Sequence, residues 1–171
     1  LYESEQALKE SAARYRSLFQ NMLNGLAYCR MQYDDHARPV DFVYLDVNEA
    51  FERLTGLTNV VGKPVSEVIP GIRELSPELF EAYGRVASTG IPETFEFDFK
   101  SQRQWLTISA YSPEKGHFVA VFDDITERKR AAEESQMVLL TAMDGFWVVD
   151  LQGRILDVNE AYCRLIGYKL D

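Results

Sequence analysis

A twelve-residue segment occurs twice in this 171-residue chain, and this internal repeat limits the possible folds more than any other feature of the sequence. Residues 46–57 (DVNEAFERLTGL) return 111 positions later as residues 157–168 (DVNEAYCRLIGY), with 8 of 12 positions identical. Upstream, MLNGL at 22–26 matches AMDGF at 142–146. A repeat of this kind indicates two copies of one structural unit.

The two copies differ in extent, and this difference predicts the domain organisation. The second copy stops at Asp171, which corresponds to Val60 of the first. The upstream match is offset by 120 positions and the twelve-residue match by 111, so the first copy has nine extra residues between the two matching segments. They fall in the polar stretch Asp34 to Pro39, where a hairpin loop can lengthen at little cost. We therefore expect four segments: an N-terminal amphipathic helix (1–23), a complete domain (24–126), a connector helix (127–143) and the truncated start of a second domain (144–171).

The last of these segments presents a problem of its own. It contains the first hairpin of a sheet without the strands that should flank it, which leaves apolar strand edges exposed. We expect residues 144–171 to be disordered, remodelled or paired with another chain.

Hydrophobic periodicity predicts an α+β fold for the complete unit. Apolar alternation or continuous apolar runs predict strands at 26–33, 40–47, 93–99, 104–111 and 118–122. Helices are expected from 49 to 55, with Asn48 as the structural N-cap, and from Ser76 to Ser88, whereas the Gly and Pro residues of 57–72 allow only single turns. Two early and three late strands with helices between them form one antiparallel sheet covered by helices on one face. The last strand has apolar residues on both of its faces, so we expect the back of the sheet to be covered as well.

Composition argues against several classes of partner. The chain has 27 acidic and 18 basic residues, a net charge of -9 that opposes binding to nucleic acid or to anionic lipid. The longest apolar runs are far shorter than the roughly 20 residues of a membrane-spanning helix. Cys29 and Cys163 lie in apolar segments without metal-ligand spacing, which is typical of reduced thiols in a cytoplasmic protein.

The sequence contains no recognisable catalytic or metal motif. A nucleophile with its base, a phosphate-binding glycine loop and a zinc-binding helix motif are all absent from its pattern. His36 and His117 are expected in surface loops, and the adjacent Asp pairs should point apart on extended backbone. We expect no metal site and no enzymatic activity in this segment itself.

Several short motifs follow one another in the first copy. They are Asn48-Glu-Ala-Phe51, Leu54-Thr-Gly56, Val61-Gly-Lys63, Val68-Ile-Pro-Gly71, Gly84-Arg-Val-Ala-Ser-Thr-Gly90, Trp105 and Asp124-Ile-Thr-Glu-Arg-Lys129. Together they resemble the PAS sensor family, in particular the bacterial sensory-box type found in histidine kinases and diguanylate cyclases. The resemblance covers about residues 15–126 and begins again at Asp144. It implies a five-stranded antiparallel sheet in the order 2-1-5-4-3, with helices on one face and flanking helices at both ends.

The resemblance also implies a pocket between the inner face of the sheet and the helices. The candidate ligand-binding residues are Tyr28, Arg30, Tyr44, Tyr83, Phe97, Trp105 and Ser109. An apolar lining with a few polar tips suits a small organic molecule. The same rings would equally serve as ordinary core residues, so a ligand-free reading stays open.

The family's known cofactors are not expected here. Flavin photochemistry needs a cysteine that the corresponding stretch around residues 62–65 lacks, and haem-binding members use a histidine on the long helix, which here has none between Ser76 and Ser88. The cofactor is therefore unknown, with a small organic ligand as the remaining possibility.

Asp124-Ile125-Thr126 corresponds to the output joint of the family. We expect Asp124 or Thr126 to cap the following helix and Ile125 to anchor the corner. The flanking helices, residues 1–22 and 127–140, predict a parallel homodimer. The resulting expectation is a sensor module that passes a signal to a downstream output domain of the same chain; the alternative is a structural dimerisation spacer.

Overall fold

The computed structural model describes residues 2–141 and 145–167. The chain divides into two compact units, Leu1–Ile125 and Thr126–Asp171. The boundary falls inside the segment Asp124-Ile125-Thr126. The two units are described separately below.

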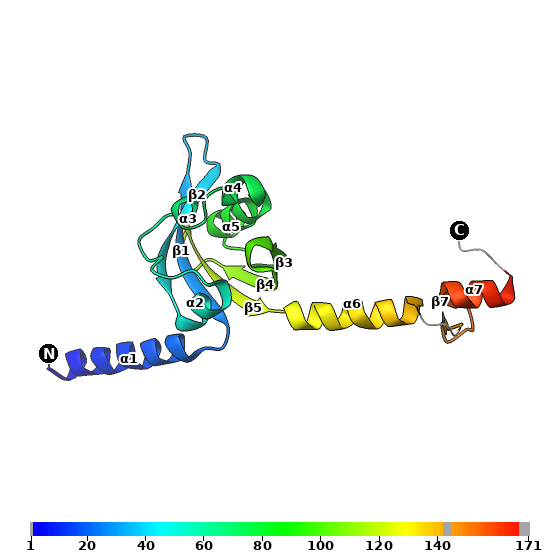
Figure 1. Cartoon of the computed structure of the whole chain (residues 1–171). Coiled ribbons are helices and arrows are strands. Elements are labelled where there is room, and N and C mark those ends of the chain that lie inside the picture. Colours follow the sequence, from blue (N-terminus) through cyan, green and yellow to red (C-terminus); the bar gives the residue numbers. More distant parts are fainter. Residues whose placement is uncertain (1, 142–144, 168–171) are drawn as a thin grey trace. The chain divides into compact units, whose positions relative to one another are not determined.

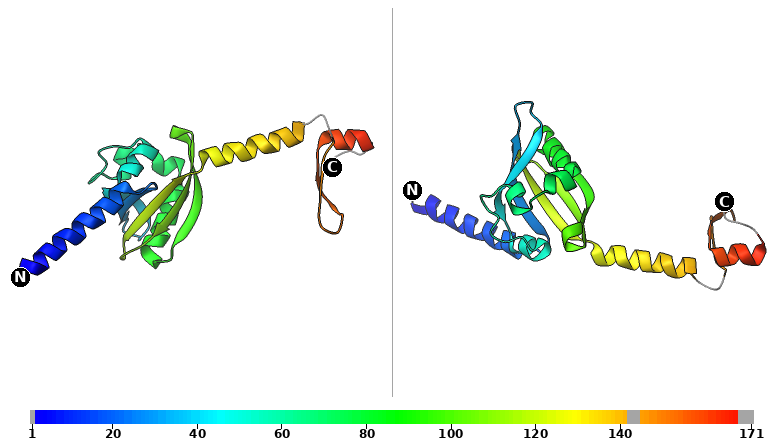
Figure 2. Two further views of the ribbon diagram at one scale, coloured as in Figure 1. Left: turned by 90° about the horizontal axis from the view of Figure 1, so that it is seen from below. Right: turned by 45° about the horizontal axis from the view of Figure 1, so that its top comes forward.

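The first unit is a five-stranded antiparallel sheet with helices on one face (Figure 1). The strand order is β2-β1-β5-β4-β3, which confirms the predicted α+β fold and its 2-1-5-4-3 order. Figure 2 shows the helices between β2 and β3 gathered on the same side of the sheet. In chain order the elements are α1 (Tyr2–Asn21), β1 (Gly25–Tyr33), β2 (Pro39–Val47), α2 (Glu49–Thr55), α3 (Val65–Val68), α4 (Ile72–Leu75), α5 (Pro77–Thr89), β3 (Glu93–Phe99), β4 (Gln104–Tyr111) and β5 (His117–Asp124).

The ends of helix α2 follow from its flanking residues. The Asn48 side chain accepts a hydrogen bond from the Phe51 N–H at the N-terminus. At the C-terminus Gly56 adopts φ 68°, a left-handed conformation that glycine reaches without steric cost, and its N–H donates to the Glu52 carbonyl. The short helix is thus fixed at both ends, and it holds the buried Phe51 against the sheet.

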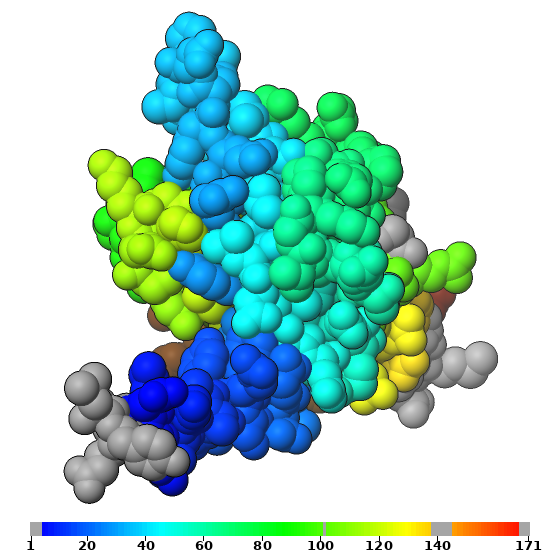
Figure 3. Space-filling view, turned by 90° about the vertical axis from the view of Figure 1, so that its left-hand side faces the viewer, coloured from blue at the N-terminus to red at the C-terminus, as the bar shows by residue number. Residues whose placement is uncertain are grey.

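The long hairpin of β1 and β2 accommodates the extra residues of the first copy. Asp34 closes its turn, because its carboxylate accepts from the backbone N–H groups of His36 and Arg38 and from the Arg38 guanidinium. The tip protrudes at the top of the face shown in Figure 3. At its base Pro39 lies so close to α5 that a Cβ on Gly84 would come within 2.6 Å of the proline ring. Glycine at position 84 therefore permits the hairpin to pack on the helix.

The core lies between the inner face of the sheet and the helices. On β5, Phe118, Ala120 and Phe122 are buried on this side. On the other face Val119 is buried and Val121 is half-buried. Further cover over that second face stays a prediction.

The second unit repeats the beginning of the first. It contains α6 (Thr126–Thr141), the antiparallel hairpin of β6 (Trp147–Val149) and β7 (Ile155–Val158), and α7 (Glu160–Ile166). The last two residues of the predicted connector, 142 and 143, lie outside the described residues. The strands β6 and β7 carry exposed apolar side chains, with Trp147 53% and Leu156 65% exposed. No described helix has the length and apolar character needed to cross a membrane.

Candidate functional site

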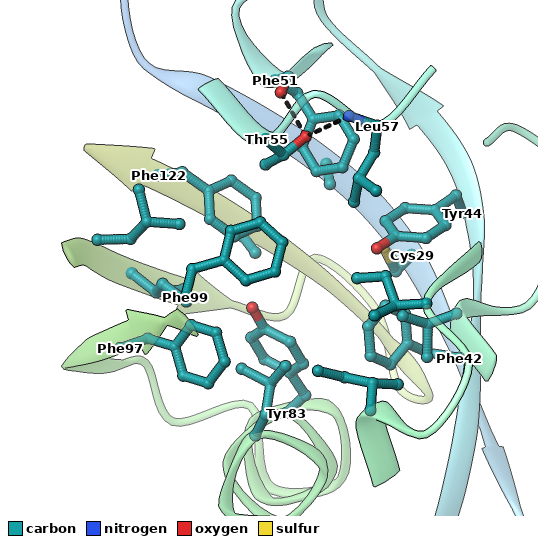
Figure 4. A pocket seen from close by; sticks show the side chains of 18 of the residues that line it. Cys29, Phe42, Tyr44, Phe51, Thr55, Leu57, Tyr83, Phe97, Phe99 and Phe122 are labelled. Carbon is teal, nitrogen blue, oxygen red and sulfur yellow. Dashed lines mark hydrogen bonds between the residues drawn. The ribbon is translucent and has the colours of Figure 1, made fainter. Parts of the chain in front are cut away.

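A cavity of about 50 Å³ lies between the sheet and helices α2 to α5 of the first unit (Figure 4). All five strands contribute inward-facing side chains to its wall. On β3 only the C-terminal residues Phe97 and Phe99 do so. Its most prominent lining groups are eight aromatic rings: Phe42, Tyr44, Phe51, Tyr83, Phe97, Phe99, Phe118 and Phe122. The cavity is thus lined by flat, apolar surfaces.

Most of these rings contact one another edge to face. Phe42 lies at the centre, with its centroid 5.5 Å from those of Tyr44 and Tyr83 and 5.3 Å from that of Phe118. Tyr83 and Phe118 stack at 4.3 Å. Such pairs are stabilised beyond the burial of their area by the attraction between ring edges and ring faces. Displacement of one ring by a ligand would therefore also move the rings that contact it.

Four side chains bring polarisable or polar atoms to this lining. Figure 4 shows the Tyr44 hydroxyl beside Cys29 and the Tyr83 hydroxyl directed toward the middle of the lining side chains, while Thr55 lies near Phe51 and Leu57. The Thr55 hydroxyl is already engaged, since it donates to the Phe51 carbonyl at 2.7 Å. Burial raises the pKa of the Cys29 thiol and of both tyrosine phenols, so all three stay protonated at neutral pH. No lining residue is charged.

The lining is chemically better suited to an uncharged molecule than to a charged one. A charged molecule would lose its hydration without gaining an opposite charge among the lining residues. An apolar or aromatic molecule gains contacts with the rings, and a hydroxyl or carbonyl on it could meet the phenols.

Three of the seven predicted pocket residues line the cavity, namely Tyr44, Tyr83 and Phe97. The other four do not line it, because they lie on the opposite face of the sheet. These are Tyr28, Arg30, Trp105 and Ser109. The reason is strand alternation, because neighbouring residues on a strand point to opposite faces.

The outward-facing residues have interactions of their own. The Tyr28 hydroxyl donates to Glu114 at 2.7 Å, and this hydrogen bond raises the pKa of Tyr28 to about 12. The Ser109 and Thr94 hydroxyls are 3.1 Å apart on adjacent strands. These contacts stabilise the back of the sheet and do not reach the cavity.

The sequence did contain a signal for the correct face of β4. The even-numbered residues of the strand are apolar and buried, namely Leu106, Ile108 and Ala110. The odd-numbered residues Thr107 and Ser109 are polar and belong to the opposite face. Trp105 is also odd-numbered, so it lies on the same face as the polar residues and points outward. The missed lining residues, such as Cys29 and Phe42, follow from the same alternation on β1 and β2.

Neither histidine is among the residues that line the cavity. His36 is in the turn of the β1–β2 hairpin, as expected. His117, in contrast, is the first residue of β5 and not part of a loop, and its ring lies 5.7 Å from that of Tyr28 on the outward face. Within residues 2–141 and 145–167, no group of three or more His, Cys, Asp or Glu side chains is arranged to hold a metal ion.

The end of β5 connects the cavity wall to the segment Asp124-Ile125-Thr126. Ile125 is 4% exposed, and its N–H donates to the Trp105 carbonyl at 2.9 Å. Asp124 pairs with Leu106, a lining residue, and accepts a hydrogen bond from the Gln104 amide at 3.3 Å. Only one residue separates Asp124 from Phe122 of the lining. A shift of the cavity wall can therefore reach this segment through two adjacent strands.

Comparison with known proteins identifies the family. The family model described as "PAS domain" matches residues 13–88 and 133–171, which is more than half of the chain. A search of curated proteins gave no significant match.

Two solved structures illustrate the similarity. One is a domain of an HTR-like protein from Haloarcula marismortui, with 19% identity, a TM-score of 0.46, and coverage of 61% of this chain and 100% of that one. The other is the PAS domain of BvgS from Bordetella pertussis, with 22% identity, a TM-score of 0.45, and coverage of 78% and 96%.

The chain therefore belongs to the PAS domain family, whose members are signal-sensing modules of signalling proteins. The match in two separate segments agrees with the internal repeat.

Proposed function

We propose that the first unit senses an uncharged, largely apolar small molecule in its cavity and passes the state of the cavity through Asp124-Ile125-Thr126 to helix α6. The observation that carries this proposal is the aromatic-lined cavity, in which every ionisable lining group is kept neutral by burial. The signal would continue to an output domain of the same protein, of the histidine kinase or diguanylate cyclase kind.

The size of the cavity gives the sensing step a physical basis. At about 50 Å³ the space is smaller than the ~150 Å³ of an engineered apolar cavity that binds benzene. A single apolar atom fits without rearrangement, whereas a ring requires the walls to move apart. Because the rings are closely packed, such widening must displace a strand or a helix.

We further propose that the chain works as a cytoplasmic homodimer. Helix α1 carries apolar side chains seven residues apart that face solvent, with Leu8 71% and Tyr15 64% exposed. Both cysteines are free and buried, which suits a reducing compartment. Pairing of α1 with its twin would cover the apolar residues.

Xenon and benzene, added separately to the whole chain, test the proposed cavity by methyl NMR. Xenon is expected to shift the methyl signals of Ala120, Ile108 and Leu106. Benzene is expected to shift the same signals and also the amide signal of Ile125, because it must widen the cavity.

The control is Ala120→Leu, which fills the space from β5 and should abolish both xenon-induced and benzene-induced shifts. If neither compound perturbs the methyl signals of the wild-type chain, the ligand-binding proposal is wrong.

The small size of the cavity also favours a second candidate, a structural dimerisation spacer without a ligand. In that case the aromatic rings are only a hydrophobic core. The spacer predicts no binding of either compound together with a stable dimer, whereas the sensor predicts binding.

A further inference from the structure

Asn48 is a polar side chain that is 1% exposed, and it belongs to the segment that the chain repeats. Its amide makes four hydrogen bonds. The oxygen accepts from the N–H groups of Leu26 (2.8 Å) and Phe51 (2.9 Å), and the nitrogen donates to the carbonyls of Phe19 (3.1 Å) and Asn24 (3.0 Å). The full capacity of the amide, two donors and two accepting positions, is therefore used.

An N-cap alone does not require this arrangement. Capping of α2 needs only the bond from the Phe51 N–H, which serine, threonine or aspartate would provide as well. The amide N–H groups instead bind the last turn of α1 and the loop that follows, where helix carbonyls lack partners within the helix. A second bond joins the same elements, since the Glu49 N–H donates to the Gln20 side chain at 2.9 Å. Phe19 is 5% exposed, so packing also holds this turn.

The other partners of Asn48 lead to the cavity. Phe51 and Thr55 of α2 line it, and Leu26 precedes the lining residue Ala27 on β1. One buried amide thus joins the C-terminal end of α1 to two parts of the cavity wall.

We propose that Asn48 is a positioning residue that couples the end of α1 to the cavity wall, so that a movement of either one is passed to the other. This inference rests on the sensor function proposed above. It adds a second coupling point, on the N-terminal side of the domain, to the Asp124-Ile125-Thr126 segment on the C-terminal side. Because coupling between two sites is reciprocal, a displacement of α1 would also change the affinity of the cavity for its ligand.

The second unit contains the corresponding residue. Asn159 is 0% exposed, and its oxygen accepts from the N–H groups of Phe146 (3.0 Å) and Tyr162 (2.9 Å), the counterparts of Leu26 and Phe51. The repeat therefore keeps the asparagine together with both acceptor bonds. It also provides a matched site for a control substitution.

Hydrogen exchange of the whole chain, followed by mass spectrometry, tests the coupling with Asn48→Ser. Serine keeps a cap oxygen for Phe51 but cannot reach the carbonyls of Phe19 and Asn24. We expect exchange in residues 14–21 of α1 to rise at least tenfold while β4 and β5 stay protected. Asn159→Ser, the matched control, should leave α1 as in the wild type. Should the serine variant not fold, Asn48→Asp, an equally good cap without donor hydrogens, takes its place.

A second comparison separates coupling from simple anchoring of α1. Ala120→Val adds two methyl groups to the cavity wall and is expected to change exchange in residues 14–21 of the wild-type chain at least threefold, but not in the Asn48→Ser chain. An unchanged α1 in Asn48→Ser, or the same response to Ala120→Val in both backgrounds, would overturn the proposal. Xenon and benzene binding are measured in parallel. If neither compound binds to the wild-type chain, the sensor function is refuted, whereas binding without an α1 response refutes only the coupling.

Discussion

Asn48, Tyr44 and Tyr83 are polar side chains inside an otherwise apolar domain, and the protein accommodates them in different ways. The Asn48 amide is saturated with hydrogen bonds to backbone groups of four segments. The two phenols instead lie among the side chains that line the cavity. The first arrangement fixes the geometry of the domain, and the second leaves hydrogen-bonding capacity for a ligand.

The buried phenols predict a loss of stability at alkaline pH. Burial raises the pKa of Tyr83 and Tyr44 in the folded state, while the unfolded chain has tyrosines with pKa near 10. Below that pH both states keep their protons. Above it only the unfolded state releases them, so the free energy of unfolding falls by up to about 1.4 kcal/mol per pH unit for each phenol.

The variant Tyr83→Phe removes one of these titrating phenols. Urea unfolding measured between pH 9 and 11 should show that its free energy of unfolding falls less steeply with pH than that of the wild type. Tyr15→Phe, on the exposed side of α1, serves as the control and should keep the wild-type slope. An identical slope in Tyr83→Phe and wild type would contradict the assignment of Tyr83 as a neutral cavity group.

At the scale of elements, alternation and capping signals predicted much of the fold. Strands β3 and β4 span Glu93–Phe99 and Gln104–Tyr111, as the apolar pattern predicts, and α2 lies between Asn48 and Gly56. Motif resemblance predicted the order of the strands, which periodicity alone does not determine. Elements whose signal is local were therefore the ones predicted best.

The site was predicted less well, because its residues depend on which face each strand turns inward. Tyr28 and Trp105 have the amphipathic character of pocket residues, yet their strands direct them outward. On β1 the buried residues Ala27 and Cys29 lie on either side of Tyr28, so Tyr28 points to the opposite face of the sheet. The size of the cavity was also beyond sequence reasoning, since it depends on how rings from β2, β3, β5, α2 and α5 pack against one another.

The exposed apolar residues of helix α1 predict dimerisation through this helix. The double substitution Leu8→Glu with Tyr15→Glu places two charges at positions seven residues apart and should raise the dimer dissociation constant at least tenfold, since like charges would face each other in a parallel pair. Light scattering at tens of micromolar provides the measurement.

The control adds the same charges elsewhere on α1, with Gln6→Glu and Ala13→Glu. This variant should dimerise like the wild type. A wild-type chain that is monomeric in this concentration range would refute the predicted dimer.

At the scale of the whole molecule, the chain contains two copies of one structural beginning, joined in sequence by α6. In the first copy, strand β5 completes the sheet beside β1 and ends at Asp124. The described residues of the second copy form the hairpin β6–β7 and the capped helix α7. The same local sequence, Asp-Val-Asn-Glu-Ala, thus produces the same strand-to-helix turn in both units.

The segment between Phe122 and Thr126 belongs to this scale, because it is where the first unit ends and α6 begins. On its inner side lies the cavity lining, and Ile125 is bonded to the Trp105 carbonyl of β4. A sensor requires that occupancy of the cavity change this segment.

The most direct measurement is the amide signal of Ile125 and the hydrogen exchange of α6 during a benzene titration of the wild-type chain and of Asp124→Ala. We predict that benzene shifts the cavity methyl signals equally in both, but that only the wild type shows a shifted Ile125 amide and at least threefold changed exchange in the first turns of α6. Benzene that occupies the cavity of the wild-type chain without any change at Ile125 or in α6 would contradict the sensor.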